Sequence, residues 1–431
     1  MWSTHMKFAI SGALATAIVF TLAALAAPAI APDPQSPVRQ AALRQSAQRA
    51  GVIPLEQIRP EADPRMAEIG ALLFESTRLS LNGDTSCQTC HLDRFASADG
   101  LPNAVGTRGV GEGADRLAHG GDIVPRNTLA LWGRGSRGFD TFFWDGKVRV
   151  TEEGVVSQFG QAAPSEDPLV VAVHLPFVEQ RELVRPDDTI SQAYEHEDVA
   201  AAEEIYAILA ERVRSDRELG APLAAAAGVA LEDIQFRHVA EAVAAFIRTR
   251  FAVTETPFHR FVAGEDTLSR AQVRGGLLFY GKARCSSCHS GPLLSDLQFR
   301  VMPFPQAGFG RNGFGVDYGR FNVTRNPDDL YRFRTPPLIN VTRTGPWSHS
   351  GAVGDLNTMV RLHVDPLHGY SGAERNERQR REDLARMIAW GAEAPLPEPL
   401  SEDEIADIVA FLSSLQTPPE ASQAPARRTS R

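Results

Sequence analysis

Two short motifs place a pair of cysteines directly before a histidine. They read Cys87-Gln88-Thr89-Cys90-His91 and Cys285-Ser286-Ser287-Cys288-His289, and together they use all 4 cysteines of the chain. Two thiols three positions apart can form thioethers with both vinyl groups of one porphyrin, and the histidine that follows can bind the iron. The sequence therefore predicts two covalently bound c-type haems, with His91 and His289 as proximal iron ligands.

Two other chemistries use the same cysteine spacing, because Cys-x-x-Cys pairs also hold zinc or act as redox dithiols. Neither explains why a histidine directly follows the second cysteine in both motifs, with no cysteine left over. A haem attachment site accounts for every one of these residues. We therefore expect haem rather than zinc or a dithiol at both motifs.

The segments around the two motifs also repeat. Upstream, Gly70-Ala71-Leu72-Leu73-Phe74 is echoed by Gly275-Gly276-Leu277-Leu278-Phe279. Downstream, two pairs of segments correspond in the same way: Arg126-Asn127-Thr128 with Arg334-Thr335-Pro336, and Phe143-Trp144-Asp145-Gly146 with Trp347-Ser348-His349-Ser350-Gly351. Self-similarity of this kind indicates an internal duplication. We expect two cytochrome c-like haem domains.

Helical patterns surround both motifs, and strand patterns are sparse. Asp63-Pro64 is a helix start before the first motif, and Ser401 with Glu404 forms a capping box near the end of the chain. Apolar residues recur at helical spacing in 236–246 and 405–412. The predicted fold is mainly α with long loops and little strand. The predicted domains are 55–190 and 255–418, joined by a helical connector at 191–254.

The composition limits the class of protein and its partners. Of 431 residues, 43% are hydrophobic and 23% charged, which is typical of a globular protein and excludes disorder as the main state. The chain has 53 acidic and 44 basic residues, a formal charge of -9, and no basic patch. Because this charge repels a phosphate backbone, we exclude nucleic acid as a partner.

Both ends of the chain differ from the rest. Lys7 precedes an apolar stretch that runs from Phe8 to about Ala26, which is typical of an export signal within residues 1–31. The stretch is also long enough for an uncleaved membrane anchor. Residues 419–431 contain proline and basic residues and are predicted to be a disordered tail. We expect export to the periplasm.

These features resemble the bacterial di-haem cytochrome c peroxidase family, which includes the enzyme that matures the quinone of methylamine dehydrogenase. The resemblance covers about 55–418 and rests on both haem motifs and on four further segments: Pro125-Arg126-Asn127-Thr128, Phe143-Trp144-Asp145-Gly146, Phe333-Arg334-Thr335-Pro336-Pro337-Leu338-Ile339-Asn340 and Thr344-Gly345-Pro346-Trp347-Ser348-His349-Ser350-Gly351. It implies that the first haem is peroxidatic and that the second relays electrons.

The resemblance also implies roles for single residues at the first haem. His119, between Ala118 and Gly120, matches a displaceable distal ligand of the iron. Glu182 matches the carboxylate that shuttles a proton between the peroxide oxygens, with Glu179 as its rival, and Trp144 matches an electron relay between the haems.

A metal site and an unusual ligand follow from the same comparison. Asn127 and the carbonyls of Thr344 and Pro346 match a calcium site, and oxygen donors are those that calcium takes. The distal ligand of the second haem falls at His363, where the family has methionine or tyrosine. Met359 is an alternative ligand and His368 a weaker third choice.

The implied function is the reduction of hydrogen peroxide with electrons from a small cytochrome c or copper protein. Two other functions stay open from the sequence. One is oxidation of a side chain on a partner protein, as in the quinone-maturing enzyme, and the other is a plain di-haem electron carrier. The resemblance further implies a homodimer.

Overall fold

The computed structural model describes residues 33, 35–194, 198–371, 373, 375–392 and 398–418. The predicted export segment 1–31 and the predicted tail 419–431 lie outside these residues. The described residues from Gln35 onward belong to one compact unit. No helix within the described ranges has the length and apolar character needed to cross a membrane.

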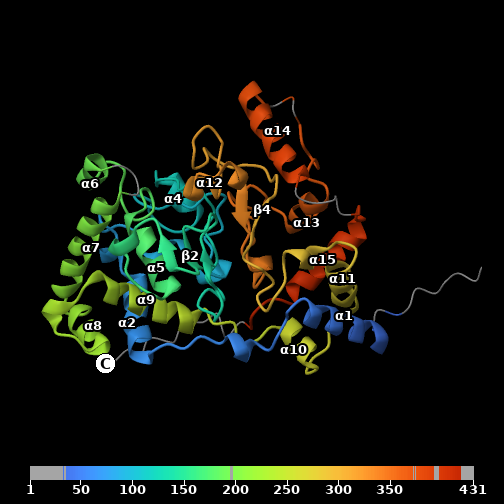
Figure 1. Ribbon diagram of the computed structural model, residues 1–431, viewed down its shortest axis with the longest axis horizontal. Coiled ribbons are helices and arrows are strands. Elements are labelled where there is room, and N and C mark those ends of the chain that lie inside the picture. Colours follow the sequence, from blue (N-terminus) through green and yellow to red (C-terminus); the bar gives the residue numbers. More distant parts are fainter. Residues whose placement is uncertain are drawn as a thin grey trace, which may run out of the picture. The chain divides into compact units, whose positions relative to one another are not determined.

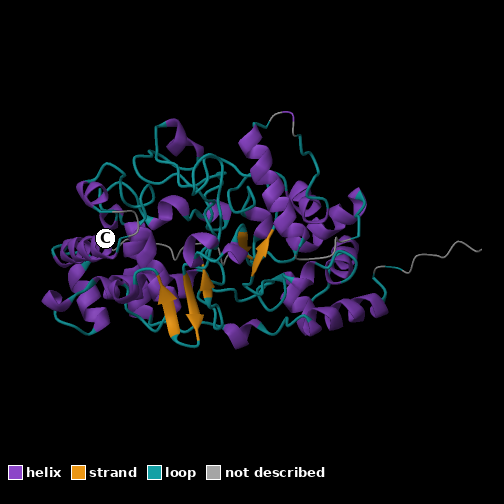
Figure 2. Ribbon diagram, turned by 45° about the horizontal axis from the view of Figure 1, so that its top comes forward, coloured by secondary structure: helices purple, strands orange, loops and turns teal. Residues whose placement is uncertain are grey.

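The fold is mainly helical with long loops and short strands, as predicted (Figure 2). The helices are α1 (Pro37–Arg49), α2 (Pro64–Glu75), α3 (Cys87–Cys90), α4 (Ala114–Ala118), α5 (Pro168–His174), α6 (Thr189–Ala193), α7 (Val199–Arg214), α8 (Gly220–Ala227), α9 (Phe236–Arg250), α10 (Pro257–Ala263), α11 (Arg270–Tyr280), α12 (Phe321–Thr324), α13 (Leu356–Val364), α14 (Glu377–Gly391) and α15 (Glu402–Ser413). The strands are β1 (Thr141–Phe142), β2 (Val148–Thr151), β3 (Gly154–Ser157), β4 (Phe299–Val301) and β5 (Arg332–Arg334).

The same pair of packed helices occurs in each half of the chain. Helix α2 precedes the first haem motif in the chain and packs on α9, which follows it. In the same way, α11 precedes the second motif and packs on α15, which follows it. A Cβ atom added to Gly70 would lie 1.9 Å from the Ala242 carbonyl oxygen, and one added to Gly275 would lie 1.8 Å from the Asp407 carbonyl oxygen. Glycine is therefore required at both crossings, which gives a physical reason for the repeated glycines and confirms the duplication.

Local signals in the sequence start these helices where expected. The Asp63 side chain accepts a hydrogen bond from the Arg65 backbone N–H, with Pro64 in the first turn of α2. Ser401 and Glu404 cap α15 reciprocally. The apolar stripe of α15 is buried at Ile405, Ile408 and Leu412. These contacts fix the helices that flank the two motifs.

Two helices pack against a half of the chain that their position in the sequence does not suggest. Helix α9, within the predicted connector, lies against α2 and α5 and so forms part of the first half (Figure 1). Helix α1, which precedes the first motif, packs on α10 and α11 of the second half. Leu43 of α1 is fully buried there, and Arg44 Nε donates a hydrogen bond to the Phe261 carbonyl oxygen at 2.8 Å.

Two small antiparallel sheets hold the segments that lie between the motifs. The order β1-β2-β3 pairs Phe142 with Val148, and the turn between these two strands contains Trp144. In the second sheet, β4 pairs with β5 so that Phe299 lies opposite Arg334. The backbone N–H of Arg334 donates to the Trp144 carbonyl oxygen at 2.8 Å. This hydrogen bond joins the two halves next to the predicted relay residue.

Candidate functional site

The first haem motif lines a cavity in the first half of the chain. Cys87 and Cys90 are the ends of the short helix α3, and His91 follows it. The Nδ1 atom of His91 lies 2.8 Å from the Ser97 carbonyl oxygen, so that an N–H there leaves Nε2 available for a metal. The apolar wall is supplied by Phe74, Leu131, Phe142, Phe177, Val243 and Ile247.

Burial around the motif favours uncharged groups. It lowers the pKa of His91 to about 4, so the imidazole is neutral and able to bind iron. It raises the pKa of Cys87 to about 12, which disfavours the thiolate that zinc requires, whereas a thioether carries no charge. All four cysteines are free, and no cluster of three or more His, Cys, Asp or Glu converges on a metal position within the described part of the chain. The donor set fits haem better than zinc.

Two glutamates and two cations form the polar part of the first cavity. Glu179 accepts from Lys147 Nζ at 2.9 Å and from Arg311 Nη1 at 3.2 Å. Glu182 lines the same cavity and has no ion pair among the described residues. Burial, and then the charge of Glu179, raise the pKa of Glu182 to about 8, although Lys147 and Arg311 oppose this shift. Glu182 thus combines a position in the first cavity with a pKa close to neutral pH.

His119 lies outside the cavity. It follows the short helix α4, its side chain is exposed, and its Nδ1 atom contacts the Asp115 carbonyl oxygen at 2.7 Å. It is not among the residues that line the first cavity. His119 therefore does not reach the first site in this conformation, and its predicted role as an iron ligand requires this loop to move.

A second cavity contains the second motif and a second histidine. Cys285, Cys288, His289 and His363 all line it. The rings of His289 and His363 are 6.4 Å apart between centroids. A metal–imidazole bond is about 2.0 Å long, so two rings on opposite sides of one iron have centres roughly 6 Å apart. This spacing is suited to a haem iron held between the two histidines.

Hydrogen bonds orient both rings for this role. His289 Nδ1 lies 3.0 Å from the Leu294 carbonyl oxygen, and His363 Nδ1 lies 2.8 Å from that of Met359. Both contacts leave Nε2 for the iron. Met359 also lines the cavity, whereas the exposed His368 does not. The geometry thus favours His363 over both alternatives for the second haem.

Two buried arginines give an independent test of whether a haem fits. Arg134 lines both cavities and Arg334 lines the second, and neither forms an ion pair among the residues described. Arg334 is 1% exposed, and its Nη2 atom has no hydrogen-bond partner in the described structure. Burial lowers the pKa of Arg334 to about 10. A buried guanidinium needs an anion, and each haem carries two propionates, so the wall between the cavities fits this cofactor.

Comparison with known proteins agrees with this geometry. The family model for di-haem cytochrome c peroxidase matches residues 64–267. The chain is 28% identical over 390 residues to the methylamine utilization protein MauG of Methylorubrum extorquens, covering 89% of this chain and 87% of that protein. It is 26% identical over 379 residues to the cytochrome-c peroxidase IdrP1 of Pseudomonas sp. strain SCT, covering 80% and 85%. Over residues 64–267 the chain is similar to the di-haem cytochrome c peroxidase family.

Solved structures show the same fold. The diheme peroxidase BthA of Burkholderia thailandensis superimposes with a TM-score of 0.59 at 19% identity, covering 88% of this chain and 94% of that one. The two haem motifs predict two c-type haems, and this number agrees with the similarity to di-haem peroxidases. Residues Cys87, Cys90 and His91 would hold one haem, and the other would be held by the second motif together with His363.

The residues expected between the haems of a di-haem peroxidase lie between the two cavities. Trp144 is buried and lines both of them. Its Nε1–H donates to the Asn127 carbonyl oxygen at 3.0 Å. Asn127 also lines both cavities, and its Nδ2 atom donates to the Pro346 carbonyl oxygen at 2.7 Å. Thr344 and Pro346 line the second cavity with it, so three groups of the predicted calcium site share one wall.

Sequence reasoning missed four charged residues of these cavities. Lys147 and Arg334 lie next to or inside the family segments, yet nothing in their spacing assigned them a role. Arg134 lies in no recognised motif, and only its burial without an anion points to a function. Arg311 is in the second half of the chain but lines the first cavity. No local sequence pattern predicts that placement.

Proposed function

We propose that this protein is a di-haem c-type peroxidase that reduces hydrogen peroxide to water with electrons from a small redox protein. The overall reaction is H2O2 + 2 H+ + 2 electrons → 2 H2O. The observation that carries the proposal is Glu182, a carboxylate with a pKa raised to about 8 in the cavity of the first haem motif. A proton acceptor with such a pKa is suited to catalysis near neutral pH.

Different residues of the first cavity have different roles in this proposed reaction. Glu182 accepts the proton from one peroxide oxygen and returns it to the other. Glu179 forms ion pairs with Lys147 and Arg311 and holds these two cations in the cavity. The apolar wall excludes water from the first cavity. The two haems, when bound, supply the electrons for cleavage of the O–O bond.

A steady-state assay tests the proposal. Protein with both haems loaded should consume hydrogen peroxide when a reduced small cytochrome c or copper protein is present. The stoichiometry should be two donor molecules oxidised for each peroxide. Absence of turnover in protein with a full haem content would exclude this function and leave the oxidation of a partner protein or a di-haem electron carrier.

Trp144 is proposed to relay electrons between the haems, and its replacement tests this role. Trp144→Phe removes the indole and its hydrogen bond to Asn127. Electron transfer from the second to the first haem should slow on the order of tenfold, equivalent to about 1.4 kcal/mol in the barrier. Stopped-flow absorbance after mixing reduced protein with peroxide measures this step. Unchanged kinetics would exclude the indole as the relay.

A calcium ion held by Asn127, Thr344 and Pro346 is a further part of the proposal. Support comes from the position of these three residues on the wall of one cavity. Metal analysis of purified protein should find calcium, and a chelator should lower turnover until calcium is restored. Asn127→Ala should weaken calcium binding about 10–100-fold. Full activity in calcium-free protein would contradict the site.

One observation favours oxidation of a partner protein as a second candidate function. His119 does not line the first cavity, and a site without a bound distal histidine is open to oxidants from the start. A protein-oxidising enzyme benefits from such a site, whereas gated peroxide reduction does not need it. Electron paramagnetic resonance of the oxidised protein decides between them, because an open site is high-spin and a histidine-bound one is low-spin.

The cellular setting is proposed from the sequence. The apolar stretch that begins at Phe8 supports export to the periplasm, where small cytochromes and copper proteins are available as donors. A homodimer is proposed from the resemblance alone. Light scattering of the purified protein and fractionation of cells check these two points.

A further inference from the structure

A loop from the second half of the chain reaches the first cavity. Arg311 lies in this loop and lines the cavity together with His91. The loop turns at Gly310, which has φ +69 and lies so close to the Val316 carbonyl oxygen that an added Cβ would be 2.2 Å away. Gly315 N–H donates to the Phe309 carbonyl oxygen at 2.7 Å. The loop is thus a closed turn with a defined position for Arg311.

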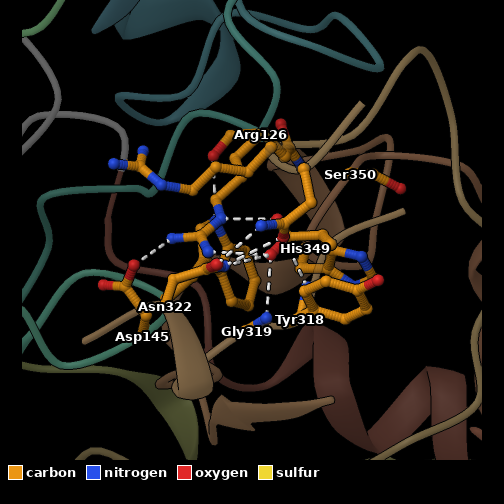
Figure 3. Close-up of polar contacts among 12 residues, drawn as sticks. Arg126, Asp145, Tyr318, Gly319, Asn322, His349 and Ser350 are labelled. Atoms are coloured by element: carbon orange, nitrogen blue, oxygen red, sulfur yellow. Dashed lines mark hydrogen bonds and ion pairs between the residues drawn. The ribbon is translucent and has the colours of Figure 1, made fainter. Parts of the chain in front are cut away.

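The end of this loop is tied to the first half by a buried ion-pair cluster (Figure 3). Arg126 donates from Nε to Asp317 at 2.7 Å and from Nη2 at 2.9 Å, and its Nη1 donates to Asp145 at 2.5 Å. The side chains of Asp145 and Asp317 are fully buried. Because a buried pair is costly to break, this cluster fixes the loop against the first half.

At the other end of the loop, Arg311 places a positive charge beside Glu182, the proposed proton carrier. Arg311 contacts Glu179 at 3.2 Å and acts electrostatically on Glu182. Its side chain is 14% exposed. Glu179 is bonded to Lys147 as well, so one carboxylate holds two cations next to Glu182. Lys147, Arg311 and Glu182 thus line the same cavity, with both cations beside the proposed proton carrier.

We propose that Arg311 is a catalytic residue of the first haem site, supplied by the second haem domain, that hydrogen-bonds the peroxide oxygen that leaves as water. The inference rests on the proposed peroxidase function. During cleavage the O–O bond breaks, and negative charge develops on the departing oxygen. That oxygen receives the proton that Glu182 took from the other oxygen, and the haems supply the two electrons. A guanidinium with donors in a planar fork stabilises this charge.

Arg311→Gln and Arg311→Lys test the proposal, with Arg325→Gln as the control. Arg325 is an exposed arginine of the same half that lies outside both cavities. Arg311→Gln should lower kcat/KM for peroxide about 10²-fold, and Arg311→Lys should retain more activity. Arg325→Gln should match the natural protein.

Fluoride binding to the oxidised protein, followed by absorbance, provides a readout that needs no turnover. Fluoride binds ferric iron and accepts hydrogen bonds from nearby donors. Arg311→Gln should weaken it on the order of tenfold, as expected for loss of a charged hydrogen bond, whereas Arg325→Gln should not. Similar fluoride affinities and similar kcat/KM values in the two Gln variants would overturn the proposal.

The two measurements also separate this inference from the proposed function. If the natural protein turns over no peroxide, the function fails, and fluoride still decides whether Arg311 contacts the ligand position. If Arg311→Gln does not load its first haem, Arg311→Lys decides in its place. Activity and fluoride affinity of Arg311→Lys equal to those of the natural protein would then overturn a role for the planar fork.

Discussion

Glu182→Gln is expected to lower kcat/KM for hydrogen peroxide by about 10²–10⁴-fold, the usual contribution of a positioned proton carrier. Glutamine keeps the shape of the side chain but cannot accept and return a proton. Both haems should remain attached, because Glu182 lines the cavity without forming part of either cysteine motif. Steady-state kinetics with matched haem content measures the loss.

The pH dependence has a defined sign. Because the pKa of Glu182 is raised to about 8, the side chain is mostly protonated at pH 7, and only the minor ionised fraction can accept a proton from peroxide. Activity of the natural protein should rise as pH increases through about 8 and then level off. Glu182→Gln should remove this rise. An activity that falls between pH 6 and 8 would contradict the assignment.

Glu179→Gln is the matched comparison for Glu182→Gln. It sits in the same cavity but is bonded to Lys147 and Arg311, so its loss should disturb the position of these cations rather than remove the proton carrier. We expect a smaller decrease in kcat/KM than for Glu182→Gln, with the pH-dependent rise retained. The reverse order of the two effects would identify Glu179 as the proton carrier.

His363→Met is expected to raise the reduction potential of the second haem. Methionine paired with histidine favours the reduced iron more than two histidines do. The expected rise is on the order of 0.1 V, within the roughly 0.8 V that axial ligands span. A spectroelectrochemical titration measures it, and paramagnetic resonance should show that the signal of an iron bound by two histidines is lost.

Met359→Leu is the control for the second ligand. Met359 lines the same cavity and its carbonyl oxygen accepts from His363, but a leucine keeps that carbonyl. The resonance signal and the potential should therefore stay close to those of the natural protein. A changed signal in Met359→Leu together with an unchanged one in His363→Met would make Met359 the ligand.

The parts of the site that could be predicted are those fixed by local covalent chemistry. Thioether formation requires Cys87, Cys90 and His91 at a set spacing, and the same holds for the second motif. The helices around them were predictable because caps such as Asp63 and close crossings such as Gly70 leave local marks. Helix content and duplication were therefore confirmed.

The other parts depend on how distant segments pack. His119 was predicted from its place before Arg126, but helix α4 buries Arg116 and leaves His119 exposed. Arg311 follows glycines in a loop far from the first motif, and contacts between distant residues, such as Asp317–Arg126 and Arg311–Glu179, bring that loop to the first cavity. No residue spacing along the chain contains such information. The sequence also did not show that α1, which precedes the first motif, packs on α11 of the second half.

For the proposed exported chain, which crosses the membrane N-terminus first, the packing of α1 and α15 sets an order of assembly. Apart from Arg311, the wall of the first cavity is complete once Ile247 has emerged. The second cavity is lined by Trp144 of the first half and by Leu412 of α15. Leu43 of α1 becomes buried only when α11 is present to pack against it. N-terminal domains generally fold first. The first cavity can therefore be nearly complete before the second, so the two haem sites are expected to form in sequence.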